Sequence, residues 1–289
     1  MPEPGPAPLV VIAAPNGARL NKRGHPAVPV TTAEIAAAAA ELAECGVSVL
    51  HLHVRGDRGE HVLDAERYRE AQAAIRDRVG DRLVVQVTTE AVGRYERGEQ
   101  MALVRELRPE AVSLALRELC PDRGAEVEAG AFFRELAERN TWPQYILYSA
   151  EETARFEQLR QEGLFGVEHP FALFVLGRYR EELEGDPAEL DAFLRAFEPG
   201  AFPWAVCCFG PAEAEAVRRA ASLGGHVRIG FENNRLLPDG TVARNNAHLI
   251  ASELALMRNN QHQVARNYIL YRTERAKERA EQAGAASDE

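Results

Sequence analysis

The chain has 289 residues, 46% of them hydrophobic and 27% charged, which is ordinary for a soluble enzyme with one sizeable core. A net charge of −10 argues against a nucleic-acid-binding protein, because such proteins need a basic face. No apolar run reaches membrane-spanning length, no signal-peptide pattern opens the chain, and the four cysteines form no C-x-x-C pair. We therefore expect a cytoplasmic protein that binds neither nucleic acid nor a membrane.

Short apolar runs alternate with amphipathic stretches along the chain. The runs that predict strands are Leu9–Ala14, Val47–Val54, Leu83–Thr88, Ala111–Leu116, Tyr145–Tyr148, Phe171–Leu176, Trp204–Phe209 and His226–Phe231. The stretches that predict helices are Thr32–Cys45, Asp64–Val79, Tyr95–Leu107, Glu126–Asn140, Glu151–Gln161, Pro187–Phe197, Pro211–Leu223 and Asn246–Met257. Eight strands, each followed by a helix, predict an α/β fold of the (β/α)₈ TIM-barrel type.

The alternative architecture is an open, doubly wound sheet, but no G-x-G-x-x-G or G-x-x-x-x-G-K-[ST] motif follows the first strand. We predict a single domain over residues 1–289, with a C-terminal helical tail from about residue 261. Two helix starts have recognisable signals: Thr31 and Thr32 precede Glu34, and Pro211 suits a first helical position.

The second predicted strand carries the first candidate site residues. Side chains alternate along a strand, so His51, His53 and Arg55 share one face, and we expect that face to point into the barrel. Catalytic residues of these barrels lie at the C-terminal ends of the strands. Two imidazoles so placed can bind one metal ion if a third ligand is near, or can be satisfied by hydrogen bonds without a metal.

The eighth predicted strand supplies the third ligand. By the same alternation His226, Arg228, Gly230 and Glu232 face one way, with Gly230 leaving room near the barrel axis. Two histidines and one carboxylate leave coordination positions open, as in a catalytic zinc site. Taken singly, Glu232 could instead cap a turn and Arg228 could be a structural ion-pair partner.

Six segments carry a resemblance to a known family. They are Ala13–Ala18, His25–Pro29, His51–Arg55, Ala91–Gly93, Phe174–Gly177 and Gly224–Glu232. Through them the chain resembles the β-keto acid cleavage enzyme family over nearly its whole length. The resemblance implies a zinc-dependent barrel, a homotetramer, and a reaction of a β-keto acid with acetyl-CoA that gives acetoacetate and a new acyl-CoA.

The same resemblance assigns roles to individual positions. It implies that His51, His53 and Glu232 are zinc ligands and that Arg228 is a catalytic arginine. Thr88 and Ser113 stand where the family has a serine and a threonine. Further candidates for contact with substrate or its reacting atoms are Thr88, Ser113, Asn16, Arg19 and Asn233.

Three positions depart from the family pattern. Asn233 replaces an aspartate proposed as the proton acceptor, and a neutral amide cannot serve as a base. Arg19 replaces a glutamate that binds an ammonium group, so we expect the chain to favour an anionic or hydrogen-bond-accepting substrate end. Glu90 stands where glycines are usual, and we hypothesise that it is the missing general base; alternatively it caps the following helix.

Three other functions are compatible with parts of this sequence. One is a different metal-dependent aldolase or hydrolase; amidohydrolases, however, carry H-x-H on the first strand and an aspartate after the last. A second is a zinc-binding homologue with lost or altered catalysis, which Asn233 would explain. The third is a purely structural subunit. The vicinal Cys207 and Cys208 are interpreted as core residues.

Overall fold

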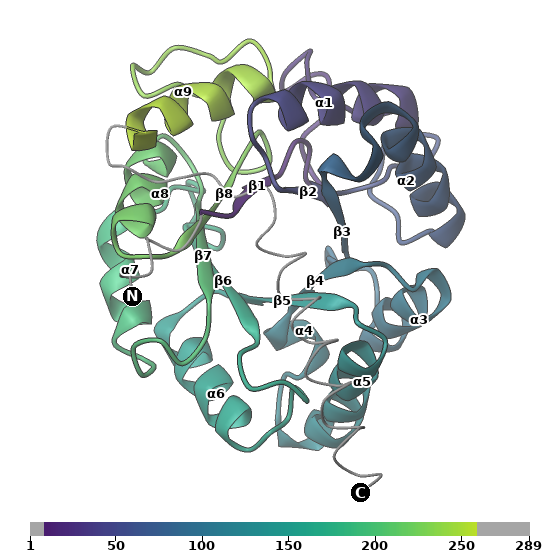
Figure 1. Ribbon diagram of the computed structural model, residues 1–289, viewed down its shortest axis with the longest axis vertical. Helices are drawn as coiled ribbons and strands as arrows, with labels where there is room; N and C mark the ends of the chain where they lie inside the picture. Colours follow the sequence, from purple (N-terminus) through teal and green to yellow (C-terminus); the bar gives the residue numbers. More distant parts are fainter. Residues whose placement is uncertain (1–8, 259–289) are drawn as a thin grey trace, which may run out of the picture.

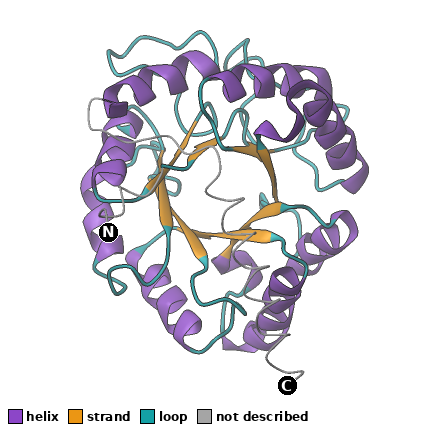
Figure 2. Ribbon diagram, in the orientation of Figure 1, coloured by secondary structure: helices purple, strands orange, loops and turns teal. Residues whose placement is uncertain are grey.

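Eight parallel strands close into a barrel, and helices surround it on the outside (Figures 1 and 2). The computed structural model describes residues 9–258. The strands are β1 (Val11–Ala13), β2 (Val49–Leu52), β3 (Val84–Thr88), β4 (Ala111–Ala115), β5 (Trp142–Leu147), β6 (Phe171–Leu176), β7 (Trp204–Cys208) and β8 (His226–Ile229). Each strand pairs with the next, and β8 pairs with β1, which confirms the (β/α)₈ barrel.

The helices follow the strands as the alternation predicted. They are α1 (Thr32–Glu44), α2 (Ala65–Val79), α3 (Arg97–Leu107), α4 (Leu116–Leu119), α5 (Glu126–Glu138), α6 (Ala150–Gln161), α7 (Leu190–Leu194), α8 (Glu213–Ser222) and α9 (Asn246–Arg258). The sequence did not predict α4, a single turn directly after β4. The predicted helix over residues 187–197 is instead a 3₁₀ turn, Pro187–Glu189, followed by the short α7.

One predicted helix start is confirmed and another is wrong. Thr31 caps α1 in a capping box, in which its hydroxyl accepts from the Glu34 amide while Glu34 accepts from the Thr31 amide. Pro211 is not the first residue of α8, which begins at Glu213. Strand β5 begins three residues earlier than expected, because Pro143 interrupted the apolar pattern but is accommodated near the start of the strand.

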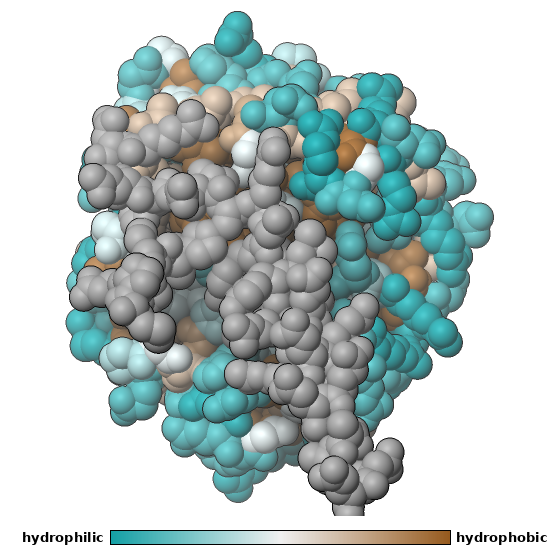
Figure 3. Space-filling model, in the orientation of Figure 1, coloured by the Kyte–Doolittle hydropathy of each residue, from teal (hydrophilic) through white to brown (hydrophobic). Residues whose placement is uncertain are grey.

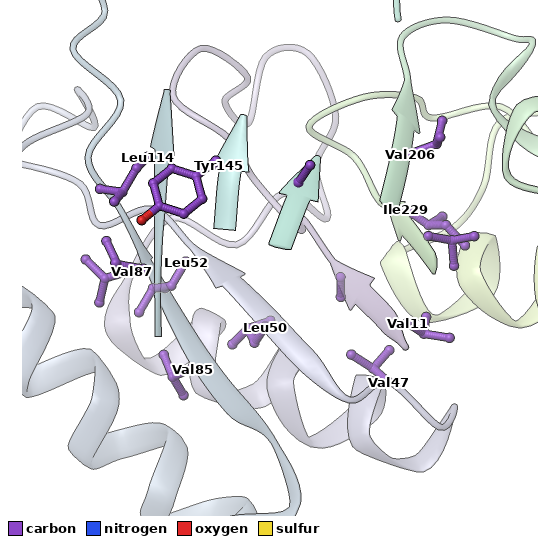
Figure 4. Close-up of a cluster of buried hydrophobic side chains, with 14 of the residues drawn as sticks. Val11, Val47, Leu50, Leu52, Val85, Val87, Leu114, Tyr145, Val206 and Ile229 are labelled. Carbon is purple, nitrogen blue, oxygen red and sulfur yellow. The ribbon is translucent and has the colours of Figure 1, made fainter. Parts of the chain in front are cut away.

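Two apolar layers hold the barrel. Outward-facing strand residues such as Leu50, Val87 and Ile229 pack beneath the helices and form the main core (Figure 4). Inward-facing residues such as Ile12, Leu173 and Cys207 fill the barrel interior as a second cluster. The alternation therefore separates the two layers, as in other filled barrels. Cys207 and Cys208 are both buried, as expected of core residues.

The outer surface shown in Figure 3 is mostly hydrophilic over the described residues. Within residues 9–258, no helix combines the length and hydrophobicity needed to cross a membrane. The predicted tail from about residue 261 lies outside the described residues.

Gly230 lies where β8 meets β1, next to the candidate site, and its lack of a side chain matters for backbone contact rather than for the expected space at the barrel axis. A Cβ at this position would lie 2.3 Å from the Ala14 carbonyl oxygen of the neighbouring strand end, and the φ angle is +149°. The Ala14 oxygen also accepts a hydrogen bond from the Glu232 amide. The missing side chain thus permits close backbone approach between the ends of β8 and β1, rather than space at the barrel axis.

We predict that Gly230→Ala lowers the free energy of unfolding by at least about 2 kcal/mol, because it adds both backbone strain and a steric clash. Gly224→Ala is the matched control: its φ is also positive, at +82°, but no atom lies within 4 Å of the added Cβ. Denaturant unfolding of both variants measures the difference. Equal losses of stability would show that the approach to Ala14 is unimportant.

Candidate metal centre and active site

Three potential ligand atoms converge at the C-terminal end of the barrel. His51 lies in β2, His53 directly follows it, and Glu232 follows β8. Strand β1 pairs with both β2 and β8, so only one strand separates the two histidines from Glu232 around the barrel. The two Nε2 atoms lie 3.1 Å apart, and each lies 3.5 Å from Oε2 of Glu232. The structure therefore brings together the three residues that the sequence selected.

A hydrogen-bond chain fixes the tautomer of His51. Its Nδ1 lies 2.8 Å from Oε1 of Gln86, and Nε2 of Gln86 donates to Oε1 of Gln144 at 3.3 Å. The Gln86 oxygen therefore faces His51 and accepts the Nδ1 proton. This leaves the Nε2 lone pair of His51 free to bind a cation.

A second chain fixes His53. Nε2 of His61 lies 3.0 Å from the Glu90 carbonyl oxygen and must donate to it, so Nδ1 of the neutral His61 ring is an acceptor. Nδ1 of His53, 3.4 Å away, donates to that atom. The Nε2 lone pair of His53 then faces the same point as that of His51. Burial lowers the pKa of His51 to about 4, of His53 to about 3 and of His61 to about 4, which keeps all three rings neutral.

Glu232 completes this cluster as an anion. Burial alone would raise its pKa, but Arg228, together with the two histidines, holds the pKa well below its usual value. Its Oε1 accepts from Arg228 at 3.0 Å, whereas the buried Oε2 has no hydrogen-bond donor among residues 9–258. Two lone pairs and a carboxylate oxygen thus face one another without a proton between them. Ligand atoms around a tetrahedral zinc ion lie about 3.3 Å apart, so these spacings fit such an ion.

Glu90 lies beside this cluster. Its Oε2 is 4.0 Å from Nδ1 of His53, and its Oε1 is 3.2 Å from the guanidinium of Arg178. Burial, reinforced by the charge of Glu232, raises the pKa of Glu90 to about 7. The glutamate does not cap the following helix, because Glu96 occupies that position in α3. The structure therefore places a carboxylate of raised pKa at the site.

Two cavities open onto the cluster. The larger has a volume of about 570 Å³ and is lined, among others, by Asn16, Arg19, Glu90, Glu232 and Asn233. The smaller, of about 20 Å³, lies among His51, Thr88, Glu90, Tyr148, Arg228 and Glu232. Both are bounded by Glu90 and Glu232, so the two cavities adjoin each other at these carboxylates, and His51 lines the smaller one. Arg19 is exposed and lines the large cavity, and no carboxylate of the described chain lies within ion-pair distance of it.

The remaining candidates have different surroundings. The side-chain amide of Asn16 donates hydrogen bonds to the carbonyls of Pro29 and His53 and so anchors the backbone that carries the candidate ligand His53. The Thr88 hydroxyl accepts from the Glu90 amide. Ser113 is buried, pairs in register with Thr88, and lines neither of the two cavities. Its hydroxyl has no hydrogen-bond partner within the described part of the chain.

Arg228 and Asn233 contact each other at the cluster. The Arg228 guanidinium donates to Oδ1 of Asn233 at 3.2 Å as well as to Glu232. Arg55, on the same face as the histidines, instead donates to backbone carbonyls, including those of Asn16, Gly17 and Leu20. Arg55 therefore holds the loop after β1 against the barrel. His226 lies inside the barrel, stacked on Phe171 with the ring centroids 5.4 Å apart.

Sequence reasoning missed four residues around the site, namely Gln86, His61, Tyr148 and Arg178. Gln86 could have been found, because it lies two residues before Thr88 in β3 and so on the same face. Tyr148 directly follows β5, two residues after the inward-facing Ile146, and could have been found in the same way. His61 and Arg178 lie in loops, where strand alternation gives no signal.

Comparison with known proteins identifies relatives over the same region. Residues 8–268 match a family model described as beta-keto acid cleavage enzyme. A protein named 3-keto-5-aminohexanoate cleavage enzyme, from Fusobacterium nucleatum, is 29% identical over 264 residues and spans 89% of this chain and 94% of its own length. A 3-oxoadipate:acetyl-CoA acetyltransferase from Cupriavidus necator is 27% identical over 266 residues, with 89% and 91% covered.

Solved structures share the fold. The ternary complex of ObcA with C4-CoA adduct and oxalate superimposes with a TM-score of 0.66 at 15% identity, covering 85% of this chain and 66% of that one. The 3-dehydroquinate dehydratase of Geobacillus kaustophilus gives a TM-score of 0.56 at 13% identity, covering 88% and 93%. At these identities the likeness concerns the barrel architecture only.

Proposed function

The chain belongs to the β-keto acid cleavage enzyme family, and we propose that it is a zinc-dependent member that uses acetyl-CoA to cleave a β-keto acid with an anionic or hydrogen-bond-accepting end. The observation that supports this most strongly is the convergence of three unprotonated ligand atoms from His51, His53 and Glu232. Relatives named for a β-keto acid substrate and for acetyl-CoA support the two substrates. A homotetrameric assembly remains a prediction from the resemblance, and a cytoplasmic location remains a prediction from the sequence composition.

The proposed reaction exchanges two acyl groups. The carbon between the keto group and the carboxylate loses a proton and attacks the thioester carbonyl, so a C–C bond forms as the C–S bond breaks. The released CoA thiolate attacks the original keto carbon, and the bond from that carbon to its neighbour breaks. The products are acetoacetate, once the proton returns, and a new acyl-CoA.

The metal and the side chains divide this chemistry. When bound by His51, His53 and Glu232, Zn²⁺ supplies a Lewis acid for the substrate's oxygens. Glu90 takes the proton from the substrate carbon and later returns it, since it is the carboxylate beside the cluster that is not itself a ligand. Arg228 donates hydrogen bonds to the oxygens on which negative charge develops. Thr88 orients Glu90, because its hydroxyl accepts a hydrogen bond from the Glu90 backbone amide.

We predict that the purified protein binds about one zinc ion per chain and that the double variant His51→Ala/His53→Ala binds none, with turnover falling more than about a thousandfold. Elemental analysis and circular dichroism measure the metal and the fold. His169→Ala, which changes a histidine outside the cluster, is the control and should keep its metal. A full complement of zinc in the double variant contradicts the assignment.

The function itself is tested by adding acetyl-CoA and a panel of β-keto acids to zinc-loaded protein and measuring new acyl-CoA. We expect the wild-type protein to turn over anionic or neutral substrates in preference to aminated ones. In Arg19→Glu this preference should fall on the order of tenfold, because the charge facing the substrate end is inverted. Arg23→Glu, in the same loop but not lining the large cavity, controls for net charge. A wild-type preference for aminated substrates refutes the role of Arg19, and absence of any thioester product refutes the enzyme in favour of a silent binding protein.

We predict that Glu90→Gln lowers turnover about a hundredfold or more, because the amide keeps the size of the side chain but cannot accept a proton. Zinc content should be unchanged, since Glu90 is not a ligand. Glu182→Gln removes another carboxylate from the same cavity and should be silent. Turnover of Glu90→Gln at the wild-type rate would mean that another group is the base.

A further inference from the structure

Two buried glutamates lie behind the cluster and have no part in the proposed reaction. Glu213 is the first residue of α8, and Glu253 lies on α9, the helix that packs beside it. Their side chains are 0% and 1% exposed. Buried carboxyl groups are costly unless they are paired or protonated, so their retention calls for an explanation.

Glu213 binds the loop that carries the active-site residues. Its Oε1 accepts hydrogen bonds from Nδ2 of Asn233 at 3.2 Å and from the Gly230 amide at 3.4 Å. Its Oε2 and both oxygens of Glu253 have no donor among residues 9–258. The two carboxyl groups lie within hydrogen-bonding reach of each other, so ionisation of both would place two like charges together in the core, and one shared proton removes this repulsion. Burial raises the pKa of both groups, and the charge of Glu253 raises that of Glu213 further.

The contact with Glu213 determines which way the Asn233 amide points. A carboxyl oxygen that only accepts requires the NH₂ end of the amide, which also donates to the Arg228 carbonyl at 3.2 Å. The Asn233 oxygen is thereby turned towards the Arg228 guanidinium, which donates to it. With the amide reversed, its NH₂ group would face the donors of Arg228 and its oxygen would face Glu213.

We propose that Glu213 and Glu253 are positioning residues: as a proton-sharing pair they lock the Asn233 amide, and through it they aim Arg228 at the metal cluster. This inference rests on the role of Arg228 in the proposed function. It also gives Asn233 a use that an aspartate could not fill, because a carboxylate at 233 would face the Glu213 oxygen without a donor between them. The asparagine then belongs to an intact site rather than to a decayed one.

The first test compares two side chains of similar length at position 213. Glu213→Gln can still accept from Asn233 with its oxygen and donate to Glu253 with its amide, so we expect a kcat within about threefold of wild type. Glu213→Met removes the acceptor, and we expect kcat to fall about tenfold while the KM for acetyl-CoA and the zinc content stay unchanged. A wild-type kcat in Glu213→Met, or an equal loss in Glu213→Gln, overturns the proposal.

The second test does not depend on Glu213→Met folding. Asn233→Asp should lower kcat at least about tenfold. Adding Glu253→Gln should recover part of this loss, because the new amide at 253 donates a hydrogen bond to Glu213. The carboxyl proton of Glu213 can then be donated to the aspartate at 233. A merely structural pair would predict additive losses in the double variant. If Glu253→Gln does not improve Asn233→Asp, the pair does not act through residue 233.

A third measurement separates this inference from the proposed function. Infrared difference spectra, wild type minus Glu213→Gln and wild type minus Glu253→Gln, should each show the C=O stretch of a buried protonated carboxyl group, because the contribution of Glu90 cancels in the subtraction. The band requires no turnover, so its presence in a protein that forms no acyl-CoA would retain the pair and reject the reaction. Turnover without the band would retain the reaction and reject the pair.

Discussion

Closure of the barrel through β1 is the constraint on which the site depends. His51 and Glu232 are far apart in sequence, and only the pairing of β1 with both β2 and β8 brings their ligand atoms to 3.5 Å. The ends of β1 and β8 approach so closely that only glycine fits at Gly230, and the Glu232 amide is held by the Ala14 carbonyl. The same backbone contact therefore completes the fold and positions Glu232, the third candidate ligand.

The side chains around the cluster determine where the protons of the two histidines and of Glu232 lie. Gln86 and His61 each accept a ring proton from one histidine and so present both Nε2 lone pairs to the same point. Arg228 keeps Glu232 ionised. Together these contacts prepare a site for a cation, which removes the repulsion among its acceptor atoms. Glu90 lies beside the cluster, paired with Arg178, and is the carboxylate that we propose for proton transfer.

The alternation of strands and helices was enough to predict the barrel, and the two-residue repeat of side-chain direction was enough to predict that His51 and His53 share an inward face. Glu232 joins them from a turn that follows β8. These patterns could not predict contacts made by loops, so the Glu90–Arg178 ion pair and the hydrogen bond of His61 were found only in the structure. The Glu213–Glu253 pair was also missed, because two glutamates on amphipathic helices look solvent-facing until α8 and α9 are packed together. The start of β5 was misplaced because Pro143 broke the pattern locally.

Arg55 holds the loop that carries Arg19, and these contacts do not involve the metal cluster. Its guanidinium donates to carbonyls on both sides of Arg19, including those of Ala18 and Leu20, through backbone groups that every residue type possesses. These contacts hold the loop without using the side chain at position 19, whereas His51 is held by β2. If residue 19 faces the far end of the substrate, as we propose, evolution can exchange it without disturbing the cluster, and one barrel can give rise to enzymes that differ in the compounds they consume.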